Sequence, residues 1–370
     1  MITPKIPFVD LAWQHRQIEQ EVTQGIARVL ASTAFVDGPD VTAFEAEFAA
    51  YCAVEHCLGV ANGTDAIELA LRAAGIGSGD EVILPTNSFV ATAEAVVRAG
   101  AVPVMVDADE RYLLIDPATT EAAVGPRTAA IIAVHLFGQM APMAPLAEVC
   151  QRHGLALFED AAQSQGARQN DIPMGGFGLA AATSFYPGKN LGAYGDGGAV
   201  LTNDDALAAK VRCIRNHGSE QKYVHTMLGF NSRLDTVQAV VLRAKLARLE
   251  HWNELRRQAA ERYNHLLRDV ESVRLPVVAP GNLAVWHLYA VRVPERDRLL
   301  QAMGAAGIGV GVHYPRPIHR QPAFASYVSG QAMTASEAAA ADMLSLPLFP
   351  GITAEQQERV VETLHKAMVA

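Results

Sequence analysis

Six short runs of apolar and β-branched residues alternate with segments of helical periodicity between residues 55 and 203. The runs are EVILP (81–85), VPVMVD (102–107), AAIIAVH (129–135), LALFED (155–160), ATSFYP (182–187) and GAVLTN (198–203). Helical candidates between them include Ala66–Ala74, Val90–Ala99 and Pro145–His153. Continuously apolar strands that alternate with helices are typical of a mainly parallel sheet sandwiched by helices. The pattern therefore predicts an α/β fold, in which ligands bind beyond the carboxyl ends of the strands.

After residue 204 the pattern changes. The segment DDALAAKVRCIRNHG (204–218) predicts a helix with an acidic start and a glycine near its end. A longer helical period over Asp235–Asp269 predicts a helix that bridges to a second domain. The remainder mixes short strands, LYAVRV (288–293) and VGVHYP (310–315), with helices that include Ala354–Met368. We expect a large domain over residues 1–250 and a smaller α+β C-terminal domain over residues 251–370.

Composition narrows the class of protein. The chain has 370 residues, of which 50% are hydrophobic and 19% charged, enough for a sizeable core. Its net charge of -9 argues against nucleic acid as the main partner. No apolar run is as long as a membrane span, and the start does not resemble a signal peptide. The four cysteines match no zinc or disulfide spacing, so we expect reduced thiols in a soluble, cytoplasmic protein.

Several familiar sites can be excluded. The tetrapeptide PGKN (187–190) resembles the end of a phosphate-binding P-loop, but Asn190 stands where Ser or Thr is required and Thr183 where glycine is required. The segment GIGVGVH (307–313) lacks the third glycine of a dinucleotide fingerprint. No HExxH occurs and the twelve histidines form no ligand cluster, so we expect no metal site.

Three features remain that carry chemistry. Lys189 lies in a turn between a proline and a run of glycines, where a solvated surface lysine is the usual interpretation. The segment NGTDAIELALRAAG (62–75) opens a helix with a polar turn, which favours an anion site, although its polar residues could be helix caps alone. Asp160, after Glu159, ends an apolar strand, where an acid is either a turn former or the partner of a protonated ring nitrogen.

Together these features are what pyridoxal phosphate needs. A lysine forms the Schiff base, and an acid keeps the pyridine ring protonated. A helix terminus with hydroxyl groups holds the phosphate. Ser184 ends another predicted strand five residues before Lys189, where its hydroxyl could join such a phosphate site. Desolvation beside a cationic ring would lower the lysine pKa from about 10.4, so that the amine can react.

The chain resembles the DegT/DnrJ/EryC1/StrS family, the sugar aminotransferases of the aspartate-aminotransferase fold (fold type I). The resemblance rests on FVDL, NGTDAIELAL, GDEVILPTNSFVATAEAV, AVHLFG, EDAAQSQGA, SFYPGKNLGAYGDGGAVLTND, GFNSRLDTVQA and VHYPRPIH, which span nearly the whole length in family order. It implies Lys189 as the Schiff-base lysine and Asp160 as the pyridinium partner. It also implies that Gln163 lies near the ring's oxygen substituent and that the phosphate ligands are Gly63, Thr64 and Ser184.

The resemblance extends to the substrate and to a second subunit. Phe89 matches an aromatic residue that stacks on the cofactor, although a phenylalanine in an apolar run is most often core. Asn231 matches a residue that reaches the phosphate of the neighbouring subunit's cofactor, which implies a homodimer with composite active sites. Arg233, His313 and Tyr314 match positions near a substrate diphosphate. A structural ion pair is the alternative for Arg233.

The implied activity is amine transfer to a nucleotide-diphosphate keto-deoxysugar. An amino acid, by family analogy L-glutamate, would convert the cofactor to pyridoxamine phosphate, and the amine would then pass to the sugar ketone. Some family members carry histidine in place of the lysine and deoxygenate instead, so Lys189 favours transamination. The segments SFYPGKNLGAYGDGG and NSRLD favour the 3-keto position. A 4-keto-sugar or keto-cyclitol aminotransferase and a non-catalytic regulator are the alternatives.

Overall fold

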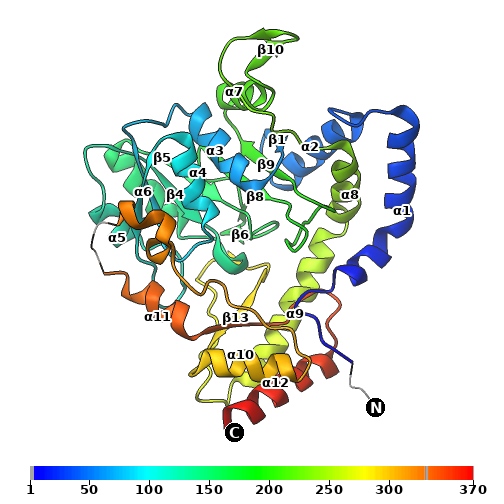
Figure 1. The fold of residues 1–370 in the computed structure, drawn as a ribbon, viewed down its shortest axis with the longest axis vertical. Coiled ribbons are helices and arrows are strands. Elements are labelled where there is room, and N and C mark those ends of the chain that lie inside the picture. Colours follow the sequence, from blue (N-terminus) through cyan, green and yellow to red (C-terminus); the bar gives the residue numbers. More distant parts are fainter. Residues whose placement is uncertain (1–3, 329, 331, 370) are drawn as a thin grey trace.

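A seven-stranded sheet forms the centre of the computed structural model, which describes residues 4–328, 330 and 332–369 (Figure 1). In spatial order its strands are β1 (His56–Val60), β9 (Gly198–Thr202), β8 (Ala180–Ser184), β5 (Ala156–Asp160), β4 (Thr128–Val134), β2 (Glu81–Pro85) and β3 (Val102–Val106). All pairings are parallel except the two that β9 makes, so β9 alone runs against the others. The predicted, mainly parallel α/β sheet is confirmed; β1 was not predicted.

Helices cover both faces of this sheet. Along β4, Ile131 and Ala133 pack into one hydrophobic cluster and Ala130 and Ile132 into another, as expected from the two-residue repeat of a strand. The first cluster includes residues of α2 (Pro39–Tyr51) and α6 (Met143–His153), and the second includes residues of α3 (Gly63–Ala73), α4 (Ala91–Ala99) and α7 (Asp205–Arg215). The helices predicted between the strands are confirmed as α3, α4 and α6, whereas α2 and the long α1 (Leu11–Ser32) were not predicted.

The predicted continuous helix over residues 235–269 is wrong. The chain forms α8 (Thr236–Leu246) and α9 (Leu249–Leu267) instead. At the break, Arg248 donates to the Ala244 carbonyl (2.8 Å) and pairs with Glu21 of α1. Val241 of α8 packs in a cluster with α1, whereas Tyr263 of α9 packs in a separate core nearer the C-terminus. The break lets the chain turn from one set of neighbours to the other.

A second core collects residues from the C-terminal third of the chain, and Ile6 joins it. Its elements, besides α9, are β13 (Tyr289–Arg292), α10 (Arg296–Ala305), β14 (Met343–Leu346) and α12 (Ala354–Val369). They lie together at the lower end of Figure 1. The predicted strand at 310–315 is wrong, because only Gly311 pairs there, with Ser345. The boundary at residue 250 stays a prediction.

Short elements connect these parts. They are α5 (Pro117–Ala122), α11 (Thr334–Asp342), β6 (Arg168–Gln169), β7 (Ile172–Pro173), β10 (Ser219–Gln221), β11 (Val224–His225), β12 (Asn282–Leu283) and the 3-10 turns η1 (Leu136–Gly138), η2 (Ile318–Arg320) and η3 (Pro322–Tyr327). All four cysteines are buried and unbridged. Within the described ranges, every helix is too short or too polar to cross a lipid bilayer.

Candidate active site

The carboxyl ends of six parallel strands lie at one edge of the sheet. Asp160, the last residue of β5, is in register with Ala182 of β8, so Ser184 lies just beyond it on the neighbouring strand. The chain leaving β1 enters α3 at Gly63, and the chain leaving β2 leads to Phe89. Residues far apart in the sequence therefore gather where a doubly covered sheet binds ligands.

The first turn of α3 lies against the end of β8. Asn62 caps the helix, its Oδ1 accepting the Asp65 amide at 2.8 Å. A Cβ added to Gly63 would lie 2.6 Å from the Ser184 Cβ, so only glycine allows this approach. The first-turn amides, including those of Gly63 and Thr64, have no carbonyl partner within the helix. These amides, the positive end of the helix dipole and the Ser184 hydroxyl together form an arrangement suited to a phosphate.

Asp160 is buried, with 6% of its surface exposed, and its carboxylate is oriented from two sides. Its Oδ2 accepts from the Thr92 hydroxyl at 2.7 Å, and its Oδ1 from the Ala162 amide at 3.2 Å. Thr92 in turn shares a 2.9 Å hydrogen bond with Ser88. Sequence reasoning missed both hydroxyls; the available signal was a threonine on the apolar face of a predicted helix.

Glu159, the neighbouring acid, forms hydrogen bonds with a loop and with His135. Its carboxylate accepts from the amides of Gly175 (2.8 Å), Phe177 (3.0 Å) and Gly178 (2.8 Å) and lies 2.9 Å from His135 Nε2. Because His135 Nδ1 accepts the Ala141 amide, its Nε2 carries the proton and donates. Burial raises the Glu159 pKa, but these hydrogen bonds outweigh it and hold the pKa below its ordinary value. The pair anchors the 175–178 loop.

Lys189 lies in the predicted turn, where its backbone amide donates to the Tyr186 carbonyl at 2.8 Å. The surrounding protein desolvates the ammonium and lowers the Lys189 pKa to about 8, while the charge of Asp160 opposes this shift. The side chain is half-buried, not a solvated surface lysine. The Lys189 amine is therefore partly neutral near pH 8, and it is close enough to Asp160 to interact with its charge.

Gln163 connects two walls of the site. Its Oε1 accepts the Phe137 amide at 2.7 Å, and its Nε2 donates to the Tyr314 hydroxyl at 3.0 Å. The Tyr314 ring lies against Phe89, with centroids 5.4 Å apart. Phe89 is 53% exposed, so it is not a core residue in this chain. Burial, followed by the charge of Asp160, raises the pKa of Tyr314, which therefore remains a phenol at neutral pH.

His313 lies against the Tyr314 ring (centroids 5.7 Å apart) and stacks on Phe8 (centroids 5.5 Å apart). Its Nδ1 lies 2.9 Å from the Ser345 hydroxyl. Burial, assisted by the charge of Lys189, lowers the His313 pKa to about 4. The imidazole is therefore neutral at physiological pH, so it contributes hydrogen bonds and no charge to the site.

Asn231 and Arg233 are the predicted site residues that lie apart from this group. Asn231 is exposed and bridges to Asn216 at the base of the β10–β11 hairpin. Arg233 donates to Asn216 Oδ1 at 2.8 Å and forms no ion pair with any residue that the structure describes. Between them, Ser232 bonds Asp65 in the first turn of α3 (2.8 Å). The segment therefore contacts the start of α3 through the buried Ser232, while Asn231 is exposed to solvent.

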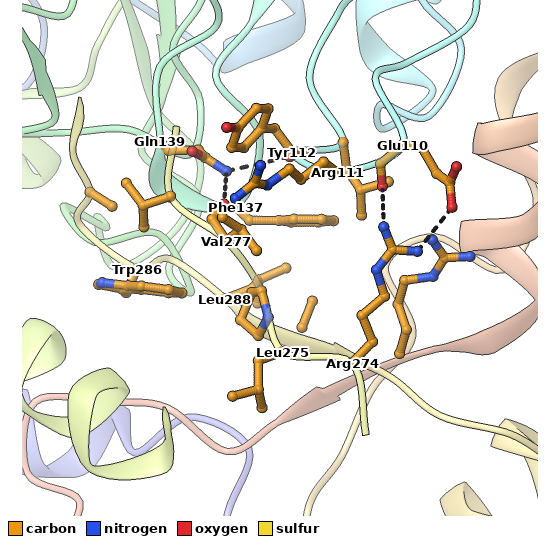
Figure 2. Close-up of a pocket in the computed structure, with 16 residues that line it drawn as sticks. Glu110, Arg111, Tyr112, Phe137, Gln139, Arg274, Leu275, Val277, Trp286 and Leu288 are labelled. Atoms are coloured by element: carbon orange, nitrogen blue, oxygen red, sulfur yellow. Dashed lines mark hydrogen bonds and ion pairs between the residues drawn. The ribbon is translucent and has the colours of Figure 1, made fainter. Parts of the chain in front are cut away.

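A pocket adjoins the site on the far side of Phe137. Figure 2 shows its two walls, one from residues 110–139 and one from residues 274–292. Phe137 lies between them, and an ion pair between Glu110 and Arg274 (3.0 Å) closes one end. Trp286 and Leu288 line the opposite wall. Because the Phe137 amide also binds Gln163, the packing of this pocket supports the wall of the active site.

The chain matches the model of the DegT/DnrJ/EryC1/StrS aminotransferase family over residues 16–365. It belongs to that family. It is 46% identical to the dTDP-3-amino-3,4,6-trideoxy-alpha-D-glucose transaminase of Streptomyces venezuelae, over 98% of this chain and 96% of the relative. It is 48% identical to the pleiotropic regulatory protein of Geobacillus stearothermophilus, over 97% of each chain. The crystal structure of S. venezuelae DesV in complex with a ketimine intermediate superposes with a TM-score of 0.96 at 46% identity, covering 98% of both chains.

Family membership confirms the predicted fold type I architecture, the enzyme class and the cofactor, pyridoxal phosphate. The residues at the sheet edge fit this group. The start of α3 with Ser184 suits its phosphate, the buried carboxylate of Asp160 suits a protonated ring nitrogen, and Lys189 offers a reactive amine. Gly63 follows β1, Asp160 ends β5, and Ser184 and Lys189 both come from the end of β8.

The lowered pKa of Lys189 gives a direct prediction. In cofactor-free protein, acetylation of Lys189 should rise with pH and level off above about 8, because only the neutral amine reacts. In urea-unfolded protein the same peptide should level off only above about 10.4. Mass spectrometry of the Lys189 peptide across a pH series measures both curves. Coincident curves would show that the fold does not perturb this amine.

Proposed function

We propose that this enzyme transfers the amine of L-glutamate to a nucleotide-diphosphate-linked 3-keto-deoxysugar. The observation that carries the proposal is the Lys189 amine, with its lowered pKa, beside the ordered Asp160 carboxylate at the edge of the sheet. The sugar class comes from the 46% identical relative, whose name specifies a 3-amino sugar. The chain covers 96% of that relative, so the likeness extends over both cores.

Each predicted cofactor residue then has a role. Gly63, Thr64 and Ser184 hold the phosphate at the start of α3. Asp160 pairs with the ring nitrogen, its orientation fixed by Thr92. Gln163 binds the oxygen substituent of the cofactor's pyridine ring. Phe89, which is half-exposed and packs against Tyr314, stacks on that ring. When bound, the cofactor supplies an electron sink for negative charge that develops at the carbon bearing the amine.

Lys189 holds the cofactor and carries protons. An amine with a pKa of about 8 can both accept and return a proton near neutral pH, which is the requirement for a general acid–base group. The carboxylate of Asp160 keeps the ring nitrogen protonated because an opposite charge favours the charged form. Tyr314 and His313, both neutral, and Arg233 are assigned to the substrate's diphosphate, with Arg233 supplying the positive charge.

The assignment of Asp160 can be tested against Glu159. Asp160→Asn should fold normally but transfer amine at least about a hundredfold more slowly, about 2.7 kcal/mol of barrier, because an amide cannot keep the ring nitrogen protonated. Glu159→Gln should lower the melting temperature, because its carboxylate holds three backbone amides. The folded fraction should keep its turnover within a few-fold. Turnover of Asp160→Asn within a few-fold of wild type would assign the role to another group.

The position of amination is tested with a panel of nucleotide-linked 3-keto and 4-keto sugars and keto-cyclitols. With glutamate as the donor, we expect 2-oxoglutarate release and an amino product from the 3-keto sugar, identified by mass spectrometry and NMR. A product from the 4-keto sugar or the cyclitol alone would replace the assigned substrate. The 48% identical relative bears a regulatory name, so bound cofactor without 2-oxoglutarate release from any ketone would favour a non-catalytic regulator.

We also propose that two chains share their active sites. In the single chain, the β10–β11 hairpin extends from the body at the top of Figure 1 and exposes Tyr223 (83%) and Leu228 (98%). Apolar residues exposed together on an extended segment indicate a surface that a partner covers. Asn231 lies at the base of this hairpin and is exposed. In a two-fold dimer each subunit makes the same contact with the other. Asn231 of each subunit would therefore bind the cofactor phosphate in the partner's active site.

Mixed dimers test the shared site. Asn231→Asp places a carboxylate against the partner's phosphate, and Lys189→Ala removes the amine. A heterodimer of the two inactive variants would contain one doubly defective site and one intact site, so about half of the wild-type activity per dimer should return. Differently tagged, co-expressed chains allow its isolation, and each variant alone must first be shown to be dimeric and inactive. An inactive heterodimer would place Asn231 in its own subunit's site.

A further inference from the structure

A buried chain of side-chain hydrogen bonds runs beneath Lys189. The amide group of Asn253, in α9, donates to the backbone carbonyl of Gln165 (2.9 Å) and accepts from Asn190 Nδ2 (2.9 Å). Asn190 Oδ1 then meets His287 Nδ1 at 3.1 Å. Gln165, Asn253 and Asn190 are at most 1% exposed. No assignment made above uses Asn190, Asn253 or His287, although Asn190 directly follows Lys189.

The hydrogen bonds fix the proton on His287. Asn190 Nδ2 donates to two oxygens, Asn253 Oδ1 and the Val285 carbonyl, both at 2.9 Å, so its Oδ1 must face the imidazole. An amide oxygen only accepts, so His287 Nδ1 carries the proton and donates. Burial, with the charges of Lys189 and Arg256, holds the pKa of His287 well below its ordinary value. His287 is therefore a neutral Nδ1–H tautomer.

Both ends of this chain are anchored. At one end, Gln165 Nε2 donates to the carbonyl of Ser184 at 2.9 Å. At the other, the Val285 amide donates to the Gly138 carbonyl at 2.8 Å. A Cβ added to Gly138 would lie 2.6 Å from the backbone nitrogen of His287, so the backbones of these two residues are in direct contact. Arg256, buried without a carboxylate partner among the described residues, donates to the Trp286 carbonyl at 3.2 Å.

The turn that carries Lys189 is held by backbone and side-chain hydrogen bonds. Gly188 precedes Lys189 and Gly192 follows it closely. The Lys189 amide donates to the Tyr186 carbonyl at 2.8 Å, and the Ala193 amide donates to the Phe185 carbonyl at 2.7 Å. The side chain of Asn190 makes three hydrogen bonds, two of them fully buried, to α9 and to the 285–287 segment. These bonds tie the residue beside Lys189 to two elements outside the turn.

We propose that Asn190 and His287 are positioning residues for Lys189, acting through the hydrogen bond from His287 Nδ1 to Asn190 Oδ1. This inference rests on the proposed function only in taking Lys189 as the residue that holds the cofactor. A lysine that must reach the same atoms in both half-reactions depends on a fixed turn, and a displacement of about 1 Å can cost about a hundredfold in rate.

Two substitutions at His287 separate positioning from packing. His287→Asn places an amide nitrogen near the position of Nδ1 and keeps the donor to Asn190, whereas His287→Gln places its amide near Nε2 and loses that donor. We expect His287→Gln to lower kcat about 10- to 100-fold with little change in the sugar KM. The kcat of His287→Asn should be at least about tenfold higher than that of His287→Gln.

The spectrum of the holoenzyme provides a readout independent of turnover. The visible band of the lysine-bound cofactor titrates with pH, and its midpoint should shift by about one unit in His287→Gln but stay near the wild-type value in His287→Asn. Melting temperatures of the two variants show whether either has lost its fold. Equal effects of both variants on kcat and on the midpoint, whether large or absent, would overturn the inference.

A second variant covers the case in which His287→Gln does not fold. Asn190→Asp keeps the shape of the side chain but turns an oxygen toward the two acceptors, Asn253 Oδ1 and the Val285 carbonyl. Losing these two donor bonds should move the turn that carries Lys189, so the midpoint of the visible band should shift and kcat should fall. A folded Asn190→Asp variant with an unchanged midpoint and unchanged kcat would overturn the inference. Borohydride reduction that fixes the cofactor on a lysine other than Lys189 would instead refute the proposed site.

Discussion

The common direction of six strands, all of the sheet except β9, is the constraint on which the site depends. Parallel strands deliver their carboxyl ends to one edge, so the helix start at Gly63, the acid at Asp160 and the hydroxyl at Ser184 meet without any long loop. At the end of β5, the two-residue repeat of the strand then divides adjacent acids between two tasks. Glu159 turns to one face and anchors a loop through His135, while Asp160 turns to the ligand side.

The charges at this edge are few and specifically placed. Lys189 is the cation and Asp160 the facing anion, while burial keeps His287 and His313 neutral. Two further cationic imidazoles beside the lysine would repel a ligand nitrogen and lower the lysine pKa further. The neutral histidines instead act through fixed hydrogen bonds, to Asn190 and to Ser345. The site thus presents one amine and one carboxylate in a largely uncharged setting.

The strands of the sheet other than β1 and three of the site residues could be predicted from the sequence, because short local patterns mark them. Buried strands are short apolar runs; Asp160 and Ser184 end two of them, and Lys189 lies five residues beyond Ser184. Helices α1 and α2 were missed because they precede the alternating pattern, and α8 and α9 were merged because the helical period continues across Arg248. The break coincides with a tertiary contact, the ion pair of Arg248 with Glu21, which no local pattern contains. Thr92, Asn253 and His287 were missed for the same reason, since their partners lie 68, 63 and 97 residues away.

Helix α9 has a mechanical consequence. Its first residue, Leu249, belongs to the hydrophobic cluster under the sheet, and its later residues, including Tyr263, belong to the second core. Asn253 lies between these two anchor points. The same helix therefore contacts both cores and, through Asn253, the residue that follows Lys189. A change in the position of the second core relative to the sheet would reach the turn that carries Lys189 through this one helix.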